Sequence, residues 1–426
     1  MINEFIYRAG ILAHNHKIND TYAFLKQSEK WDLNALEEYQ FKKLTDLLHH
    51  AYKYSSYYRD KFDAAKVRLG DIRTLDDIRR IPATTKDELL KNVGGIQIRN
   101  GSERLYYSET SGSSGTPLVF YRNQDWDAWH RASVYRGYSW YGVEPWERNG
   151  YLWGYNIALK RRLKIRLLDA LQNRFRLFSY KDDEIDAFVH KMRDAAFLSG
   201  YSSMVYEIAK RINERGLNKK FNLKMVKGTS EKIYDSYRVE VERAFNLKLT
   251  SEYGAAEAGI IAFECPMGNM HMNMETVIVE EEDHEIIVTN LVSRSFPIIR
   301  YKLGDYVELD LDTRCPCGMA HRIVKEVTGR VGKVIYGKKE KYPSLTLYYV
   351  FKNLAMEHQL VLNYKATQSV KGQLHVGIEN ELKIGEKDLL IQEFEKYFKD
   401  DISLDIDDQA NFRTFSYKKV DFVSKI

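Results

Sequence analysis

Apolar residues recur at helical spacing early in the chain, over residues 20–64. In "LNALEEYQFKKLTDLLHHAYKYSSYYRDKF" they fall three or four places apart, which predicts helices with one buried face. Asp32 precedes this run and is a favourable N-cap residue. We therefore expect a helical start over residues 1–64.

From residue 104 onward, short β-prone runs alternate with amphipathic helices. The pattern predicts mostly helix over 183–215, around a turn at 199–203. "NLKMVKGTS" and "LKLTSEYGAAEAG" each predict a strand followed by a loop, with "KIYDSYRVEVERAF" as a helix between them. This β-α-β order indicates an α/β domain whose ligand lies at loops beyond the carboxyl ends of the strands.

Beyond "VTGRVGKVI" the pattern changes to that of a compact α+β unit. A helix is predicted over 345–358, paired strands in "QLVLNYKATQ" and "QLHVGIE", a helix in "EKDLLIQEFEKYFKD" and a last strand near "NFRTFSYKKVDFV". A chain of 426 residues exceeds one typical core. We expect a boundary near Gly332, with an N-terminal domain over 1–331 and a C-terminal one over 332–426.

Composition and charge narrow the class of protein. Apolar residues make up 44% of the chain, which is typical of a folded globular protein, and Lys plus Arg exceed Asp plus Glu by only 65 to 60. That small excess favours an anionic small-molecule ligand over nucleic acid. Glu4 and Arg8 interrupt the apolar N-terminus, so we expect no signal peptide. We also expect no membrane span and, with three cysteines, no disulfide framework and a cytoplasmic location.

The segment 160–176, "KRRLKIRLLDALQNRFR", carries seven basic residues and one acid. Leu163, Leu167, Leu171 and Phe175 share one face of the helix that it predicts. Two interpretations follow: peripheral contact with a membrane surface, or an ordinary helix with a solvated basic face. We favour the second.

The segment 110–117, "TSGSSGTP", holds only hydroxyl residues, glycines and a proline between two β-prone runs. Glycines let backbone amides turn toward an anion, and hydroxyls donate hydrogen bonds to phosphate oxygens. It is not a Walker A loop, because no Gly-Lys-Ser/Thr follows. The segment predicts a polyphosphate-binding loop, with a flexible surface turn as the alternative.

This loop resembles the phosphate loop of the adenylate-forming enzymes, in the branch of the phenylacetate–CoA ligases and their CapK-like relatives from capsular polysaccharide biosynthesis. Three more elements match in order: "SEYGAAEAG" at 251–259, "FPIIRYKLGD" at 296–305 and "TGRVGKVI" at 328–335. The start "LTDLLHHAYKYSSYYRDKF" is also similar. The likeness spans nearly the whole chain. It implies an α/β fold with a large multi-sheet N-terminal domain and a small mobile α+β C-terminal lid.

The resemblance assigns residues to the nucleotide. Those that would wrap the β- and γ-phosphates of ATP are Thr110, Ser111, Gly112, Ser113, Ser114, Gly115 and Thr116. Those that would line the adenine are Gly228, Thr229, Ser230 and Glu231, with Tyr253, next to Gly254, stacked on the base.

It also assigns three single roles. Glu257 would hold Mg²⁺, Asp305 would accept hydrogen bonds from both ribose hydroxyls, and Arg330 would lie near the nucleotide at the domain junction. Taken alone, Asp305 after a glycine also fits a turn residue, and Glu257 fits a helix cap.

The implied reaction is carboxylate activation. Displacement of pyrophosphate from ATP turns an unreactive carboxylate into a mixed anhydride, with a metal and oriented donors stabilising the charge. The acyl group would then pass to a thiol such as CoA or to an amine. Two alternatives stay open: an amide-forming ligase in polysaccharide decoration, and a nucleotide-binding module without catalysis. The acyl pocket is expected in the region 120–160 together with the "GYSS" turn, with core packing as the alternative for its tryptophans, which are Trp126, Trp129, Trp140 and Trp153.

The sequence departs from the family pattern at four places. Ala256 stands where threonine is usual, Leu118 where many relatives have lysine, and Gly332 where the hinge is commonly Asp or Lys. Lys418 aligns with the C-terminal catalytic lysine, although Tyr417 replaces the usual glycine and Lys419 competes for the role.

All three cysteines fall in two short segments, "ECPMGNMH" and "RCPCGMAH". Cys265, Cys315 and Cys317 together with His271 make the ligand set of a closed, structural Zn²⁺ site. His321 is an alternative fourth ligand, and buried free thiols are the alternative to a metal. We favour zinc, because proline, glycine and polar neighbours are untypical of a core.

Overall fold

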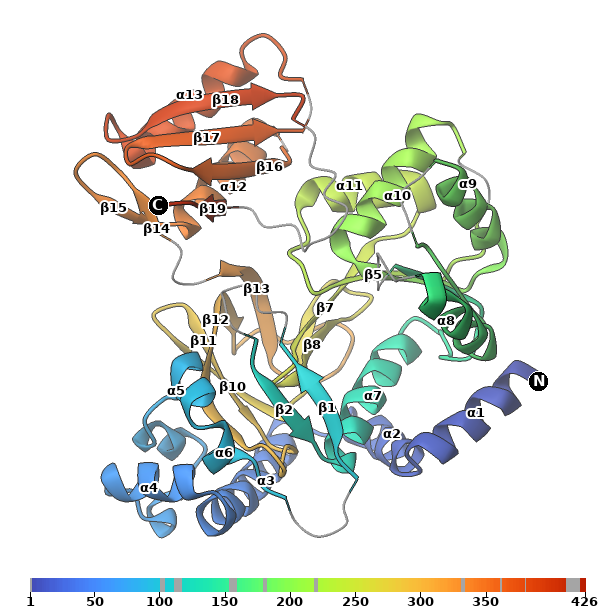
Figure 1. Ribbon diagram of the computed structural model, residues 1–426, viewed down its shortest axis with the longest axis vertical. Coiled ribbons are helices and arrows are strands. Elements are labelled where there is room, and N and C mark those ends of the chain that lie inside the picture. The colour runs from blue at the N-terminus through green and yellow to red at the C-terminus, as the bar shows by residue number, and fades with distance from the viewer. Residues whose placement is uncertain are drawn as a thin grey trace.

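The computed structural model describes residues 2–99, 104–110, 117–152, 159–178, 182–217, 221–330, 334–360, 362–379, 381–410 and 422–426. The chain begins with helices that cover one end of the molecule (Figure 1). The predicted cap is confirmed: the Asp32 carboxylate accepts a hydrogen bond from the Ala35 N–H at 2.8 Å. These helices are α1 (Ile2–His14), α2 (Lys17–Ser28), α3 (Leu33–Tyr54), α4 (Ser56–Ala64), α5 (Lys86–Lys91) and α6 (Val93–Ile96), with 3-10 turns η1 (Leu69–Asp71) and η2 (Asp76–Arg80).

A large sheet forms the body of the molecule, and among the described residues it has 11 strands in the order β10-β11-β12-β13-β9-β8-β7-β6-β5-β3-β4. The β4-β3-β5-β6-β7 part is parallel, and the rest is antiparallel. The strands are β3 (Asn149–Leu152), β4 (Arg174–Arg176), β5 (Phe197–Tyr201), β6 (Met225–Thr229), β7 (Leu249–Ala255), β8 (Gly259–Glu264), β9 (Met270–Met272), β10 (Val277–Glu282), β11 (Glu285–Asn290), β12 (Ile298–Asp310) and β13 (Ile323–Arg330).

Helices pack on the parallel part and confirm the predicted α/β class. One core cluster joins β5 and β6 to the helices that follow them, and another joins α3 and α4 to β12. A separate hairpin, β1 (Tyr106–Glu109) with β2 (Val119–Arg122), lies in front of the sheet (Figure 1). The helices of this region are α7 (Gln124–Ser139), α8 (Leu159–Leu171), α9 (Asp182–Lys191), α10 (Ser202–Glu214) and α11 (Asp235–Phe245), with a 3-10 turn η3 (Met192–Asp194).

The prediction for 183–215 is wrong at its centre. Residues 197–201 form β5, an inner strand of the sheet, and α10 begins at Ser202. Four of the five residues of β5 are buried, so the strand lacks the alternation that marks a half-exposed strand. A strand buried on both faces reads in sequence like part of a buried helix.

Residues after 334 form an α+β unit with a hydrophobic core of its own, which includes Leu354, Val376 and Phe394. Its sheet has the order β18-β17-β16-β19, and the predicted pairing of β16 with β17 is confirmed. Glu379 ties this unit to α10, because its carboxylate accepts from Tyr206 Oη and Lys210 Nζ, each at 2.9 Å. The elements are β14 (Val334–Tyr336), β15 (Lys341–Pro343), α12 (Leu345–His358), β16 (Tyr364–Gln368), β17 (Gln373–Ile378), α13 (Glu386–Phe398), β18 (Ser403–Asp408) and β19 (Phe422–Ser424).

The basic segment forms a helix as predicted, but its surroundings differ from the interpretation that we favoured. α8 ends at Leu171, and Phe175 lies buried in β4 rather than on the helical face. The apolar face is the exposed one, with Leu163 at 74% and Leu167 at 64% exposure. Within the described part of the chain, no helix is both long and apolar enough to cross a bilayer.

Candidate active site

One large cavity, of about 1400 Å³, brings together the segments that carry the predicted nucleotide residues. Its walls come from the β1–β2 hairpin, α7, the carboxyl ends of the parallel strands, β12 and β13. Ser344, Tyr364 and Phe422 from the C-terminal unit also line it. The predicted site residues that line this cavity are Thr110, Thr229, Ser230, Glu231, Tyr253, Gly254, Glu257 and Asp305.

Thr110 lies where the β1–β2 hairpin meets the predicted phosphate loop. Its backbone N–H donates to the Leu118 carbonyl at 3.0 Å, and its Oγ1 accepts from the Leu118 N–H at 2.9 Å. These two hydrogen bonds hold together Thr110 and Leu118, which lie on either side of residues 111–116. The rest of the predicted phosphate loop, residues 111–116, lies outside the described residues.

Tyr253 and Asp305 meet across the cavity wall. The Tyr253 hydroxyl donates to Asp305 Oδ2 at 2.9 Å, which joins the end of β7 to β12. Arg330 is the register partner of Asp305 on β13, so its backbone runs beside that carboxylate, while its side chain is outside the description. Gly254 has no room for a side chain, because a Cβ there would lie 2.4 Å from the Gly259 carbonyl oxygen.

Glu257 lies in the tight turn between β7 and β8 and is 6% exposed. Its Oε1 accepts from the Tyr301 hydroxyl at 3.4 Å, and its carbonyl accepts from Asn290 Nδ2 at 3.1 Å. Ala256, which also lines the cavity, has no hydroxyl to offer a phosphate. Glu257 therefore presents a buried, oriented carboxylate, an oxygen ligand of the kind that Mg²⁺ takes.

The "GTSE" segment follows β6 at the cavity. A Cβ on Gly228 would lie 2.7 Å from Ser202 Oγ, so close packing against the start of α10 requires glycine there. Glu231 accepts from the Ser203 N–H at 2.9 Å and therefore caps α10. This capping role for Glu231 was not expected from the sequence.

The hinge residue Gly332 and the two candidates for the catalytic lysine, Lys418 and Lys419, lie outside the described residues. The chain re-enters the description at Phe422, a residue of the cavity wall that pairs with Ala366 of β16.

The expectation that four tryptophans form the acyl pocket is wrong for two of them. Trp126 lines the cavity, whereas Trp129 packs against Phe24 and Trp140 packs against Phe263. Trp153 is outside the description. α7 turns one face to the cavity, with Trp126, His130, Val134 and Tyr138 at i, i+4 spacing, and this spacing was the signal available in the sequence.

Two charged pairs on the cavity wall were missed. Lys227 of β6 and Glu252 of β7 form a buried ion pair at 2.6 Å. Burial alone would lower the pKa of Lys227, but the Glu252 carboxylate outweighs it, so the pKa is raised and the lysine stays charged. On α7, Arg131 pairs with Asp127 at 3.2 Å. The Lys227–Glu252 pair depends on the pairing of β6 with β7, whereas Asp127 and Arg131 lie four residues apart on α7, a spacing that the sequence shows.

The three cysteines and His271 converge at one point. The four candidate ligand atoms all lie within 4.8 Å of one another. Cys265 Sγ is 3.6 Å from Cys315 Sγ, and Cys317 Sγ is 3.2 Å from His271 Nε2. These spacings approach the edge of about 3.8 Å expected for a tetrahedron with Zn–S bonds of about 2.3 Å.

A buried polar network stands behind this cysteine cluster. His271 Nδ1 donates to the His321 carbonyl at 3.1 Å, which leaves Nε2 facing the sulfurs. The His321 ring is 3.0 Å from Glu275 Oε1, so the alternative in which His321 is the fourth ligand is set aside. Arg136 of α7 binds the same carboxylate at 2.6 Å, and Ser28 of α2 also donates to it at 2.6 Å.

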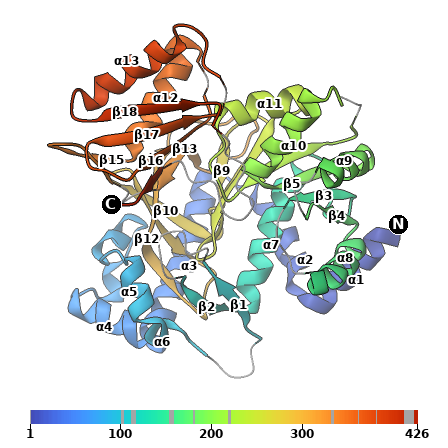
Figure 2. The ribbon, with the colours of Figure 1, turned by 45° about the horizontal axis from the view of Figure 1, so that its top comes forward.

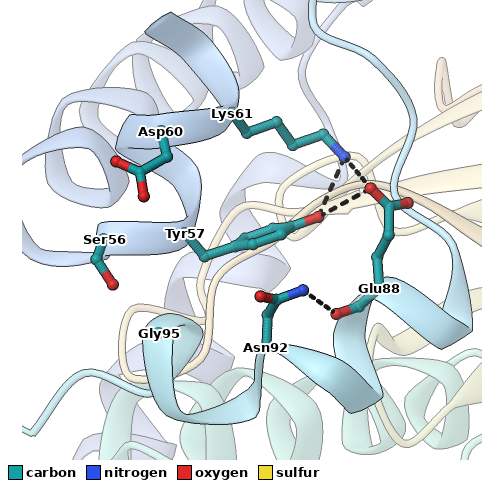
Figure 3. Close-up of a pocket in the computed structure, with 7 residues that line it drawn as sticks. All are labelled: Ser56, Tyr57, Asp60, Lys61, Glu88, Asn92 and Gly95. Carbon is teal, nitrogen blue, oxygen red and sulfur yellow. Dashed lines mark hydrogen bonds and ion pairs between the residues drawn. The ribbon is translucent and has the colours of Figure 1, made fainter. Parts of the chain in front are cut away.

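A second, smaller cleft of about 360 Å³ lies between α4, α5 and α6 (Figure 3). Lys61 lines it and makes three hydrogen bonds there. Its Nζ donates to Tyr57 Oη at 3.2 Å, to Glu88 Oε1 at 3.2 Å and to the Ala83 carbonyl at 3.1 Å. Asn92 donates to the Glu88 carbonyl at 2.8 Å. These groups satisfy one another and hold the helices together, so we read this cleft as structural.

Comparisons with known proteins agree with the geometry. No family model matches the chain. It is 26% identical to protein CapK of Staphylococcus aureus over 313 residues, which is 70% of this chain and 69% of that protein. It is 25% identical to phenylacetate-coenzyme A ligase of Escherichia coli (strain K12) over 308 residues, 66% of this chain and 69% of the ligase.

The fold matches that of 2-hydroxyisobutyryl-CoA ligase in its postadenylation state, with a TM-score of 0.74 at 15% identity over 94% of this chain and 92% of that one. The sequence relatives and the shared fold agree. The chain is therefore similar in sequence to CapK and to the phenylacetate–CoA ligases, and it shares the fold of an adenylate-forming CoA ligase.

Proposed function

We propose that this protein activates a carboxylic acid as its acyl-adenylate, with release of pyrophosphate from ATP, and then passes the acyl group to an acceptor. One observation carries the proposal: Thr110, Glu257 and Asp305, from three distant segments, line a single cavity. An acid oxygen attacks the α-phosphorus of ATP, the bond to the pyrophosphate oxygen breaks, and a mixed anhydride results. The enzyme needs no nucleophilic side chain for this step.

The cavity supports a definite orientation of ATP. We propose that the phosphates lie at the loop after Thr110, the adenine near Ser230 and Tyr253, and the ribose at Asp305. The Tyr253 hydroxyl donates to Asp305 Oδ2 and orients the carboxylate, a group whose paired oxygens suit the two ribose hydroxyls. Glu257 would hold Mg²⁺, which would neutralise charge on the phosphates.

We propose that residues 332–426 act as the lid and bring Lys418 to the reacting carboxylate. Two features support this role: the unit has its own core, and Phe422, shortly after Lys418, lines the cavity. The proposed acceptor is the thiol of CoA, which the name of the E. coli relative states for that protein. Transfer to an amine, with formation of an amide, is the other outcome that the acceptor experiment distinguishes.

We also propose that Cys265, His271, Cys315 and Cys317 bind a structural Zn²⁺. Three thiolates and one imidazole fill a tetrahedral ion and leave no position open for a substrate, so the metal has a structural role. The hydrogen bond from His271 Nδ1 to a backbone carbonyl is the support that metal-bound histidines usually have.

The decisive test of the function is acid-dependent exchange of radioactive pyrophosphate into ATP, measured on the full chain with a broad panel of acids. We expect at least one acid to raise exchange well above the rate without acid, and CoA or an amine then to consume the adenylate. Tight ATP binding with no exchange for any acid would instead identify a nucleotide-binding module without catalysis.

A further inference from the structure

The proposed nucleotide residues line only part of the cavity, and we call the part that α7 lines the α7 arm. Its walls are Arg122 of β2, the inner face of α7, Arg174 of β4, Lys227 of β6 and Glu252 of β7. A Cβ added to Gly259 would lie 3.5 Å from Trp126 and 3.7 Å from His130 Nδ1, so the arm adjoins the turn that carries Glu257. A bound acid would therefore enter the arm with the end opposite its reacting carboxylate.

Hydrogen-bonding groups without partners point to what fills the arm. Arg122 Nε, Trp126 Nε1 and His130 Nδ1 are buried atoms that lack a hydrogen-bond partner among the described residues. Arg122 lies over the Trp126 ring at 3.9 Å, and His130 stacks on the same indole at 5.0 Å. Three polar groups thus form one cluster on the arm wall. Such buried groups normally have a partner, so a bound molecule that accepts from Arg122 and Trp126, and from His130 in its Nδ1–H tautomer, would complete the cluster.

The charge of the arm favours an anion. Arg122, Arg131, Arg174 and Lys227 face Asp127 and Glu252, so cations outnumber carboxylates on the wall. Arg131 and Lys227 are paired with those two acids, and Arg174 lies 3.9 Å from the buried Asp169 behind the wall.

Arg122 forms no ion pair with any described residue. It lies opposite Tyr106 at the base of the hairpin, roughly 10 Å along β2 from Val119, which follows the predicted phosphate loop. Its charge is therefore placed away from the phosphates of ATP.

We propose that the acid activated by this protein carries a second anionic group, a carboxylate or phosphate, which binds Arg122, Trp126 and His130 in the α7 arm. This inference rests on the function proposed above and specifies its substrate class. A purely hydrocarbon acid would bury the guanidinium of Arg122 without an ion-pair partner, which is costly. The arm therefore selects against acids such as phenylacetate.

Pyrophosphate exchange with matched pairs of acids tests this substrate class. Glutarate and 3-phosphonopropionate are compared with pentanoate and phenylacetate on the full chain. We expect kcat/KM for the dianionic acids to be at least about 100-fold higher, because a site built for polar contacts rejects an analogue that lacks them. Higher exchange with the monoacids overturns the inference and leaves the proposed function standing, whereas exchange with no acid overturns both.

Arg122→Met provides the residue-level test. We expect kcat/KM for the dianionic acids to fall at least about 10-fold through KM, while the monoacids and the KM for ATP are unaffected. Arg104→Met removes an exposed arginine from just before the partner strand of the same hairpin and should change neither value. An equal loss with both acid classes would contradict a contact with the second anionic group. If Arg122→Met does not fold, the acid panel on the unaltered protein still decides.

A different observation concerns the outer surface. α1 and α8 lie side by side (Figure 2), and together they carry eight of the 17 large hydrophobic side chains that are exposed in the described part of the chain. Basic Lys164 and Arg166 flank the apolar residues of α8. The acid of this helix, Asp169, is buried and bound to Arg176 at 2.9 Å, so its charge is turned inward. We call this surface the α1–α8 patch; its apolar residues include Ile2, Phe5, Leu12, Leu163, Leu167 and Leu171.

We infer that the α1–α8 patch binds the surface of an anionic lipid bilayer. Exposed leucines at i, i+4 spacing beside basic side chains are typical of a helix that lies in the interfacial plane, and the charge of α8 complements acidic headgroups. The apolar residues would enter the acyl boundary while the arginines and lysines stay among the headgroups.

Sedimentation with vesicles tests the patch. We expect the full chain to sediment with phosphatidylcholine vesicles that contain 30 mol% (roughly the acidic share of a cytoplasmic leaflet) phosphatidylglycerol, and not with phosphatidylcholine alone. Leu163→Glu with Leu167→Glu should lower binding at least about 10-fold, and Val239→Glu, an equally exposed site on α11, should not. Failure to bind anionic vesicles overturns the inference, and dimerisation abolished by the same double substitution would identify a second copy as the partner instead.

Discussion

Asp305→Ala lowers acid-dependent ATP–pyrophosphate exchange by at least about 100-fold. The proposed ribose contact consists of two hydrogen bonds to a carboxylate, each worth about 1.5 to 3 kcal/mol, and about 1.4 kcal/mol corresponds to a factor of ten. Tyr253→Phe removes only the hydrogen bond that orients this carboxylate, so a smaller loss, of about 10-fold, is expected. Exchange kinetics at saturating and limiting ATP measure both effects.

The matched control is Glu308→Ala, on the same strand. Glu308 forms an exposed ion pair with Lys325, and such surface pairs contribute little to stability. Its substitution should leave exchange and thermal unfolding unchanged, and Asp305→Ala should retain the Tm of the unaltered protein. Undiminished exchange in Asp305→Ala would remove this carboxylate from the site.

Cys315→Ser abolishes zinc binding and lowers the Tm by about 10 °C, because a structural zinc site adds its binding free energy to folding. Cys315 Sγ is a candidate ligand that also accepts a hydrogen bond from Asn269 Nδ2 at 3.2 Å, so its sulfur is oriented by the loop around it. Protein purified without added metal should contain one zinc per chain by elemental analysis, and the variant should contain none.

Met267→Ser controls for this experiment. Met267 lies in the loop between β8 and β9 that carries Cys265 and is 56% exposed, so its replacement should retain both the zinc and the Tm. Zinc content near zero in the unaltered protein, or full retention in Cys315→Ser, would contradict the metal and favour three free thiols.

The elements that could be predicted from the sequence depend on local patterns. The Asp32 cap, the strand–loop segments after Met225 and Leu249, and the Cys-Pro-Cys turn follow from residues within a few positions of one another. Their convergence on one cavity followed from the resemblance of ordered motifs, because each motif alone fits an ordinary turn or cap. Glu231, which caps α10, is an example of a predicted site residue with a structural role as well.

What could not be predicted depends on contacts between distant segments. Lys227 and Glu252 become a pair only because β6 and β7 are neighbours in register, and Arg122 reaches α7 only through the position of the hairpin. Likewise, periodicity shows which residues of α8 share a face. It does not show that the apolar face is left uncovered, which depends on where α1 packs.

Two faces of α7 have separate roles, and one of them binds the buried carboxylate of Glu275. Arg136 anchors the helix to Glu275 on the side away from the cavity, while Trp126 and His130 face the α7 arm. The residues proposed to select the acid can therefore be exchanged without loss of the contact that holds the helix in place. For protein engineers this helix is a natural place to install new substrate preferences, provided that the Arg136–Glu275 anchor is left intact.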